Sequence, residues 1–264
     1  MTRILALLPL LLASGLAATV ETYDRFVPLV HDGDGWSTQI TLVNLSPKPA
    51  TILVTFMDPA GFLDTWKVVL KSNFGKVIAN MVDLPLAPGA TAVIETSGAP
   101  TRLTRGFVEI IEYGDQPVGG FATLTRKEGD RIVQRLEIPL SPEHERRSVV
   151  PVDLSDPQVT AEMVWVSITS TATLDLLFRN LAGETVLRDQ LTFDNRAQIF
   201  VDLRREFRQL KDFRGTLQWT VTFPNADRYE PRILAAVGLQ SSGGGWTIRP
   251  GMTLPADQAS SSPY

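Results

Sequence analysis

The fold is decided by the stretch Thr216-Leu217-Gln218-Trp219-Thr220-Val221-Thr222-Phe223. Every second residue is large and apolar, and the residues between them are Thr or Gln. Because successive side chains of a β-strand point to opposite faces, the four apolar side chains lie on one face of a half-buried strand. Such a strand needs an apolar layer on one side and water on the other.

Working outward from this stretch, a strand-like composition recurs along the chain. Turn signals such as Asp58-Pro59-Ala60-Gly61 and Ala87-Pro88-Gly89 separate the segments. Many short strands divided by turns are typical of a sandwich or barrel rather than of alternating strands and helices. The other predicted strands are residues 38–44, 51–56, 90–96, 107–113, 118–126, 132–138, 162–168, 174–179, 198–203 and 233–240.

Landmarks of the first half return in the same order in the second half, which indicates an internal repeat. Their separation shrinks toward the C-terminus, so we expect an insertion in the first copy near residues 71–84. The matched pairs are Val27-Pro28 with Val150-Pro151, Ala60-Gly61 with Ala182-Gly183, Ala90–Thr96 with Gln198–Leu203, Arg105-Gly106 with Arg214-Gly215, and Gly120-Phe121 with Gly238-Leu239.

The repeat predicts an all-β protein of two tandem β-sandwich domains of immunoglobulin-like size, because an apolar strand face must be buried and a second sheet is the available partner. The expected domains are residues 22–140 and 148–254, joined by the polar, charged segment 141–147. One short helix is expected in the second domain at residues 203–213, where apolar residues fall at helical spacing. Residues 255–264 are expected to form a disordered tail.

The N-terminus has the features of a secretory signal peptide. Arg3 precedes the apolar run Ile4–Leu12, and Gly15 and Ala17 are the small residues that a signal peptidase reads. We therefore expect cleavage near Ala17 and a periplasmic or secreted protein. No later apolar run approaches the roughly 20 residues needed to cross a bilayer, so no membrane span is expected.

Composition removes several classes of function. The chain has no cysteine, which excludes disulfides and thiolate chemistry. Its net charge of −4 argues against nucleic acid as a partner, because nucleic-acid binders carry a basic patch or stripe.

The first half resembles a recurrent class of bacterial secreted proteins with tandem, immunoglobulin-like β-sandwich repeats and no established activity. The resemblance implies an exported pair of sandwiches and supplies no catalytic residue. It covers most of the first unit and is looser in the second. The residues that carry it are Phe26-Val27-Pro28, Gly35-Trp36-Ser37-Thr38, Leu42-Val43-Asn44, Pro49-Ala50-Thr51, Ala87-Pro88-Gly89, Ile94-Glu95-Thr96, Gly106-Phe107-Val108 and Gly119-Gly120-Phe121-Ala122.

The sequence offers little for catalysis. It has only two histidines, His31 and His144, and His144 lies in the charged linker. A Ser-His-Asp site needs a base positioned on the serine, and no Gly-x-Ser-x-Gly elbow occurs. We therefore expect that the protein is not an enzyme and that it uses no cofactor.

Asp32 and Asp34 form the most suggestive candidate for a metal site, since carboxylate oxygens suit calcium. An EF-hand loop beginning at Asp32 would need an oxygen ligand where Trp36 stands and a glutamate where Val43 stands. The interpretation we favour is a tight turn in which Gly33 and Gly35 adopt positive φ. No metal is expected.

Trp36 and Trp246 each follow a glycine-rich loop, where an exposed indole could stack on a sugar ring. Trp66 is a third candidate. The alternative is that these side chains fold back over the end of a core, as large aromatic residues usually do.

Three functions stay open. The first is a non-enzymatic exported structural or interaction module, such as an adhesion or surface component, that uses loops at the sandwich ends. The second is a carbohydrate-binding protein that uses the loop tryptophans. The third is a periplasmic chaperone-like pair of sandwiches that offers an edge strand to another chain. The expected partners are a protein or a glycan at the cell surface.

Overall fold

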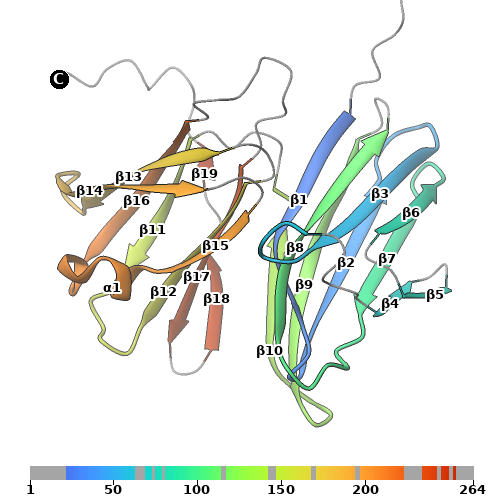
Figure 1. Cartoon of the computed structure of the whole chain (residues 1–264), viewed down its shortest axis with the longest axis horizontal. Coiled ribbons are helices and arrows are strands. Elements are labelled where there is room, and N and C mark those ends of the chain that lie inside the picture. The colour runs from blue at the N-terminus through green and yellow to red at the C-terminus, as the bar shows by residue number, and fades with distance from the viewer. Residues whose placement is uncertain are drawn as a thin grey trace, which may run out of the picture.

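The computed structural model describes most of the chain and is nearly all β, as the sequence predicts (Figure 1). The predicted signal peptide, the tail 255–264, Trp66 and His144 lie outside the described residues. The described residues are 22–62, 69–72, 75–78, 81–113, 117–141, 147–167, 171–193, 197–222, 234–242, 245–249 and 252–253.

The first half forms two antiparallel sheets. Sheet A has the strand order β1-β8-β3-β6, and sheet B has the order β10-β9-β2-β7-β4-β5. Their strands are β1 (Thr22–Asp32), β2 (Trp36–Asn44), β3 (Ala50–Met57), β4 (Val69–Ser72), β5 (Gly75–Ile78), β6 (Met81–Leu86), β7 (Thr91–Thr96), β8 (Thr104–Tyr113), β9 (Val118–Glu128) and β10 (Arg131–Pro139).

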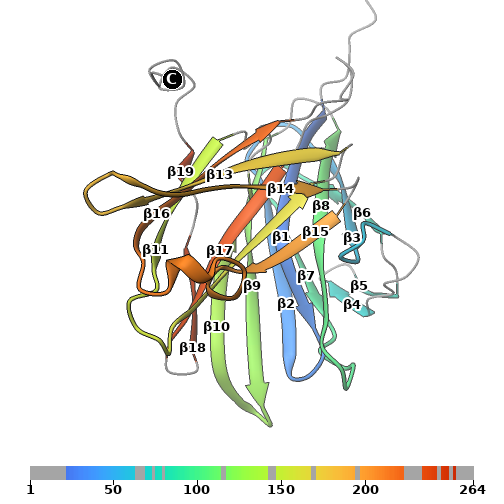
Figure 2. The same ribbon diagram turned by 60° about the vertical axis from the view of Figure 1, so that its left-hand side comes forward.

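The second half forms another two antiparallel sheets (Figure 2). Sheet C has the order β14-β13-β16-β11-β19, and sheet D has the order β15-β12-β17-β18. Their strands are β11 (Arg147–Asp153), β12 (Thr160–Ser167), β13 (Ala172–Asn180), β14 (Thr185–Phe193), β15 (Ala197–Asp202), β16 (Arg214–Thr222), β17 (Leu234–Ser242), β18 (Gly245–Arg249) and β19 (Met252–Thr253).

The two sandwiches share one topology, which agrees with the landmarks in the sequence. The order β1-β8-β3-β6 corresponds to β11-β16-β13-β14, and β10-β9-β2-β7 corresponds to β18-β17-β12-β15. Registers match as well: Val108 pairs with both Val27 and Phe56, and Leu217 pairs with both Val150 and Phe178. The hairpin of β4 and β5 has no counterpart among the described strands of the second copy, and it lies where the shrinking offsets place an insertion.

The deciding stretch is a strand buried on one face. Leu217, Trp219 and Val221 are buried, while Gln218 and Thr220 on the other face are partly exposed. Trp219 of sheet C meets Trp165 of sheet D edge to face, with ring centroids 6.1 Å apart. This aromatic contact joins the two layers at the centre of the second core.

The predicted helix is present but shorter than residues 203–213. It consists of α1 (Leu203–Glu206) and the 3-10 turn η1 (Arg208–Leu210). The Asp202 carboxylate caps it by accepting hydrogen bonds from the backbone N–H groups of Arg204 and Arg205. Its apolar side chains, Leu203, Phe207 and Leu210, lie in the second core.

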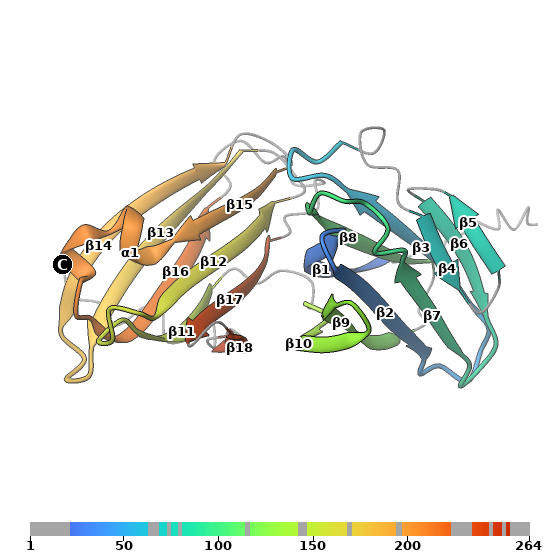
Figure 3. The same cartoon turned by 90° about the horizontal axis from the view of Figure 1, so that it is seen from below.

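The outer face of sheet D packs against the first sandwich (Figure 3). Val164 of β12 and Leu239 of β17 belong to the same apolar cluster as Val27 and Leu29 of β1. A smaller cluster extends this contact and contains Phe26, Met57, Phe107, Val166 and Ala235. The two sandwiches are therefore joined by a continuous apolar contact.

Strands β12 and β17 are consequently covered on both faces. Trp165 and Ala236, which alternate with the interface residues, belong to the core of the second sandwich. This explains why the runs 163–166 and 235–239 are apolar at every position rather than at alternate ones.

Gln198 is the main polar connection between the sandwiches. It is buried on β15, and its side-chain Nε2 donates to the carbonyl oxygens of Pro28 at 2.6 Å and Gly106 at 2.9 Å. Its backbone N–H donates to the carbonyl of Pro59 at 2.7 Å. All three acceptors belong to the first sandwich, so this residue fixes the position of sheet D on sheet A.

We predict that Gln198→Ala lowers the free energy of unfolding by about 2–3 kcal/mol, because two buried carbonyls lose their donor. Urea denaturation measures the change. The matched control is Gln190→Ala on the exposed strand β14, for which we expect a change within about 0.5 kcal/mol. Equal effects of the two substitutions would contradict the assigned role of Gln198.

Candidate functional site

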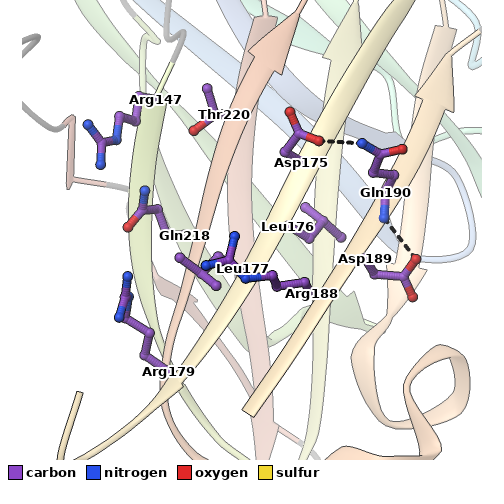
Figure 4. A pocket seen from close by; sticks show the side chains of 10 residues that line it. All are labelled: Arg147, Asp175, Leu176, Leu177, Arg179, Arg188, Asp189, Gln190, Gln218 and Thr220. Atoms are coloured by element: carbon purple, nitrogen blue, oxygen red, sulfur yellow. Dashed lines mark hydrogen bonds between the residues drawn. The ribbon is translucent and has the colours of Figure 1, made fainter. Parts of the chain in front are cut away.

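A hollow of about 670 Å³ lies on the outer face of sheet C (Figure 4). Strands β11, β16, β13 and β14 contribute neighbouring side chains to it, because residues paired across an antiparallel sheet share a face. One row across the sheet runs from Arg147 through Thr220 and Asp175 to Gln190. The hollow also contains Arg179, Arg188, Asp189, Gln218 and Leu177.

Hydrogen bonds hold part of this surface in place. The Gln190 side-chain amide donates to Asp175 at 2.6 Å, and the Gln190 backbone N–H donates to the Asp189 carboxylate at 2.8 Å. With its amide oxygen turned toward Arg147, Gln218 accepts from Nε and Nη2 at 3.1 Å each. Within the described residues, neither Arg147 nor Arg188 forms an ion pair. Arg147 already donates to Gln218, whereas Arg188 is exposed on β14 and its guanidinium group is available to a partner.

Strand β14 is the exposed edge of this surface. Phe193 is its only buried residue, and no strand of the described chain pairs with its outer side. In the first sandwich, the corresponding strand β6 has Leu84 fully buried, whereas its counterpart Leu191 is only partly buried. On the facing layer of the first sandwich, β4 and β5 extend sheet B past β7. The facing layer of the second sandwich, sheet D, ends at β15, the counterpart of β7, so the edge at β14 is more open than the edge at β6.

A second candidate site is a smaller cavity of about 130 Å³ between the sandwiches. Its apolar wall includes Trp36, Trp246 and Phe200, together with leucines from both sandwiches. Its polar lining consists of His31, Arg105, Arg126 and Glu162. The cavity exists because sheet D covers the space beside β1, β9 and β10.

His31 is the buried titratable group of this cavity. Its ring meets Trp36 edge to face at 5.0 Å, and neither ring nitrogen has a hydrogen-bond partner among the described residues. Burial, together with the positive charge of Arg105, lowers the pKa of His31 to about 3. The imidazole is therefore neutral at physiological pH.

Glu162 faces the same cavity from sheet D. Burial raises the pKa of its carboxyl group, while the nearby Arg105 partly offsets that rise. Arg105 itself lies over the ring of Phe200, 5.0 Å from the centroid. Perturbed pKa values in a lined cavity are typical of a binding site.

The structure brings two of the three predicted tryptophans together. Trp36 is buried and Trp246 is half-buried, and both line the cavity between the sandwiches rather than the surface. Gln134 of β10 fixes this arrangement by donating to the Trp246 carbonyl at 3.3 Å. The Trp36 indole is 7% exposed, whereas Trp246 keeps part of its surface accessible to solvent.

Asp32 and Asp34 belong to the tight turn that the sequence predicts. Gly33 pairs with Trp36, and the two central residues, Asp34 and Gly35, have φ values of 51° and 78°. Positive φ at both positions is typical of a type I′ hairpin turn.

The two aspartates also have different surroundings. The Asp32 carboxylate is buried and accepts from the Gly98 N–H at 2.7 Å, whereas Asp34 is exposed. Within the described residues, no group of three or more His, Asp or Glu side chains could hold a metal ion.

The geometry offers no catalytic pair at His31. The hydroxyl group of Thr38 is engaged with the His31 backbone, accepting from its N–H at 2.9 Å and donating to its carbonyl at 2.8 Å.

No family model, curated protein or solved structure matches the chain. None of the helices within the described residues has the length and apolarity to cross a membrane.

The lowered pKa of His31 predicts acid sensitivity. The unfolded state binds a proton near pH 6.5 and the folded state does not until about pH 3, so stability falls as the pH falls through that window. The contribution is about 1.4 kcal/mol for each pH unit. Between pH 7.5 and 4.5, His31→Gln should therefore lose roughly 3 kcal/mol less stability than the wild type.

Urea denaturation at pH 7.5, 6.5, 5.5 and 4.5 measures both profiles. The difference at pH 7.5 gives the packing cost of the substitution alone. Parallel profiles down to pH 4.5 would refute the assignment of a neutral, buried His31.

Proposed function

We propose that this protein is an exported, non-enzymatic interaction module that binds another protein on the outer face of sheet C. The observation that carries the proposal is the hollow of about 670 Å³ lined by Arg147, Arg179 and Arg188. Sheet D lies between this face and the first sandwich, so docking of the sandwiches leaves the face open to solvent (Figure 1). The signal-peptide features of residues 1–17 support export.

The chemistry of the hollow favours an acidic, extended segment as the partner. The outer face carries three arginines and one aspartate, Asp175, which is already engaged with Gln190. Asp189 alternates with these residues along β14, where it pairs with the buried Leu176. Arginine forms paired hydrogen bonds with carboxylates, which gives orientation as well as affinity. The open edge of β14 lets a partner strand continue sheet C beside these arginines.

The same edge supports a second candidate, a chaperone-like role toward an unfolded chain in the periplasm. The supporting observation is that β14 is exposed along most of its length and unpaired on its outer side within the described chain. An unpaired edge strand is a template for another strand. The two candidates differ in the partner, which is a folded surface protein in the first and an unfolded subunit in the second.

Site-specific cross-linking in the cell envelope tests the proposal. A photo-reactive residue replacing Gln190 on sheet C should capture one dominant protein, which mass spectrometry identifies. The matched control replaces Gln39 on β2, a partly exposed residue of sheet B. With the purified partner, Arg188→Glu should weaken binding at least about tenfold, because it reverses the charge at the site.

Arg131→Glu is the charge-matched control, since Arg131 is exposed on β10 of the first sandwich. It should leave the affinity unchanged. Capture from Gln39 but not Gln190, or equal losses for the two arginine variants, would refute binding at sheet C. Capture of an unfolded envelope protein would select the chaperone-like role.

A further inference from the structure

The cavity between the sandwiches contains polar groups that nothing in the described chain satisfies. Both ring nitrogens of His31 and the Nε of Arg126 are buried without a hydrogen-bond partner among the described residues. His31 is 8% exposed, and Glu162 is paired with no cation in the described chain. Leaving buried donors unpaired is costly, so this arrangement favours a bound group that accepts hydrogen bonds.

The charges of the lining indicate the sign of that group. Arg105 and Arg126 bring two positive charges to the cavity, and Glu162 brings one negative charge. A single negative charge balances this set, whereas a dianion would meet the repulsion of Glu162. A carboxylate also suits the donors present, because guanidinium N–H groups and an imidazole N–H can all donate to its two oxygens.

The volume and the walls restrict the rest of the ligand. The cavity of about 130 Å³ is slightly smaller than a 150 Å³ cavity that accommodates benzene, which corresponds to about five or six non-hydrogen atoms. Trp36 and Trp246 provide apolar walls for a short hydrocarbon chain. The exposed side chain of Arg105 places one side of the cavity at the solvent boundary.

We propose that this cavity binds a small aliphatic monocarboxylate of about three to four carbons. The carboxylate accepts hydrogen bonds from Arg126, Arg105 and His31, and the hydrocarbon end lies between Trp36 and Trp246. The ligand contacts both sandwiches and stabilises their docking. This site is separate from the protein-binding surface proposed on sheet C.

Propionate and its uncharged isostere propionamide are the test probes, with the full mature chain as the protein. Tryptophan fluorescence should change saturably with propionate, with a Kd on the order of 1 mM or tighter, as expected for a ligand of five non-hydrogen atoms. The Tm should rise with the same concentration dependence. Propionamide should bind at least about tenfold more weakly, because it lacks the charge that the arginines recognise.

Two substitutions with opposite expected effects make the test independent of folding defects. Arg126→Gln should weaken propionate binding at least about tenfold by removing a charged donor. Glu162→Gln should tighten it several-fold by removing a repulsive charge beside the carboxylate. Arg131→Gln, on the surface of β10, is the control and should leave the Kd unchanged.

Several outcomes would overturn the proposal. These are no saturable change with propionate up to about 50 mM, equal binding of propionamide, or a Glu162→Gln variant that binds more weakly than the wild type. The first result would mean that the cavity holds only water. None of these outcomes bears on the cross-linking result at sheet C, so the two proposals fail separately.

Discussion

The rest of the structure depends on the burial of sheet D on both of its faces. On one side, Trp165 packs against Trp219 within the second sandwich. On the other side, Val164 and Leu239 join the apolar cluster of the first sandwich. Since the hydrophobic effect is roughly proportional to the apolar area removed from water, this sheet stabilises both its own sandwich and the docking of the two.

Docking on this sheet also gives the remaining surfaces different surroundings. The space beside β1 and β10 becomes a cavity between the sandwiches with His31 and Glu162 in its lining. The opposite side of the second sandwich, sheet C, stays open with its arginines and with the outer edge of β14, which no described strand pairs. A tandem repeat of two similar units therefore has two different surfaces, because only one sheet of the second unit is covered.

The sequence predicts strands best where one face of the sheet is exposed to solvent and the other is buried. The alternation in β16 identifies it at once, because its inner residues are buried and its outer residues are polar. The alternation of polar and apolar residues does not identify strand β1, because residues 26–32 are buried on both faces. The pattern does not identify strand β14 for the opposite reason, since eight of its nine residues are at least partly exposed.

The site residues follow the same logic. Trp36 and Trp246 attract attention as loop aromatics, but the sequence cannot show that docking places both against one cavity. Arg147 and Arg188 carry no motif, because they lie 41 residues apart and line the same hollow from β11 and β14, with β16 and β13 between them. The two arginines can be recognised as part of one surface only once the strand order is known, because they are then seen to be polar residues on the outward face of the same sheet.

Differential scanning calorimetry tests the central claim most directly, because it shows whether the sandwiches unfold together. The wild-type protein should unfold in a single transition whose calorimetric and van't Hoff enthalpies agree. Val164→Asp, which places a charge on the buried outer face of sheet D, should separate the unfolding into two transitions. Two independent transitions in the wild type would contradict the account.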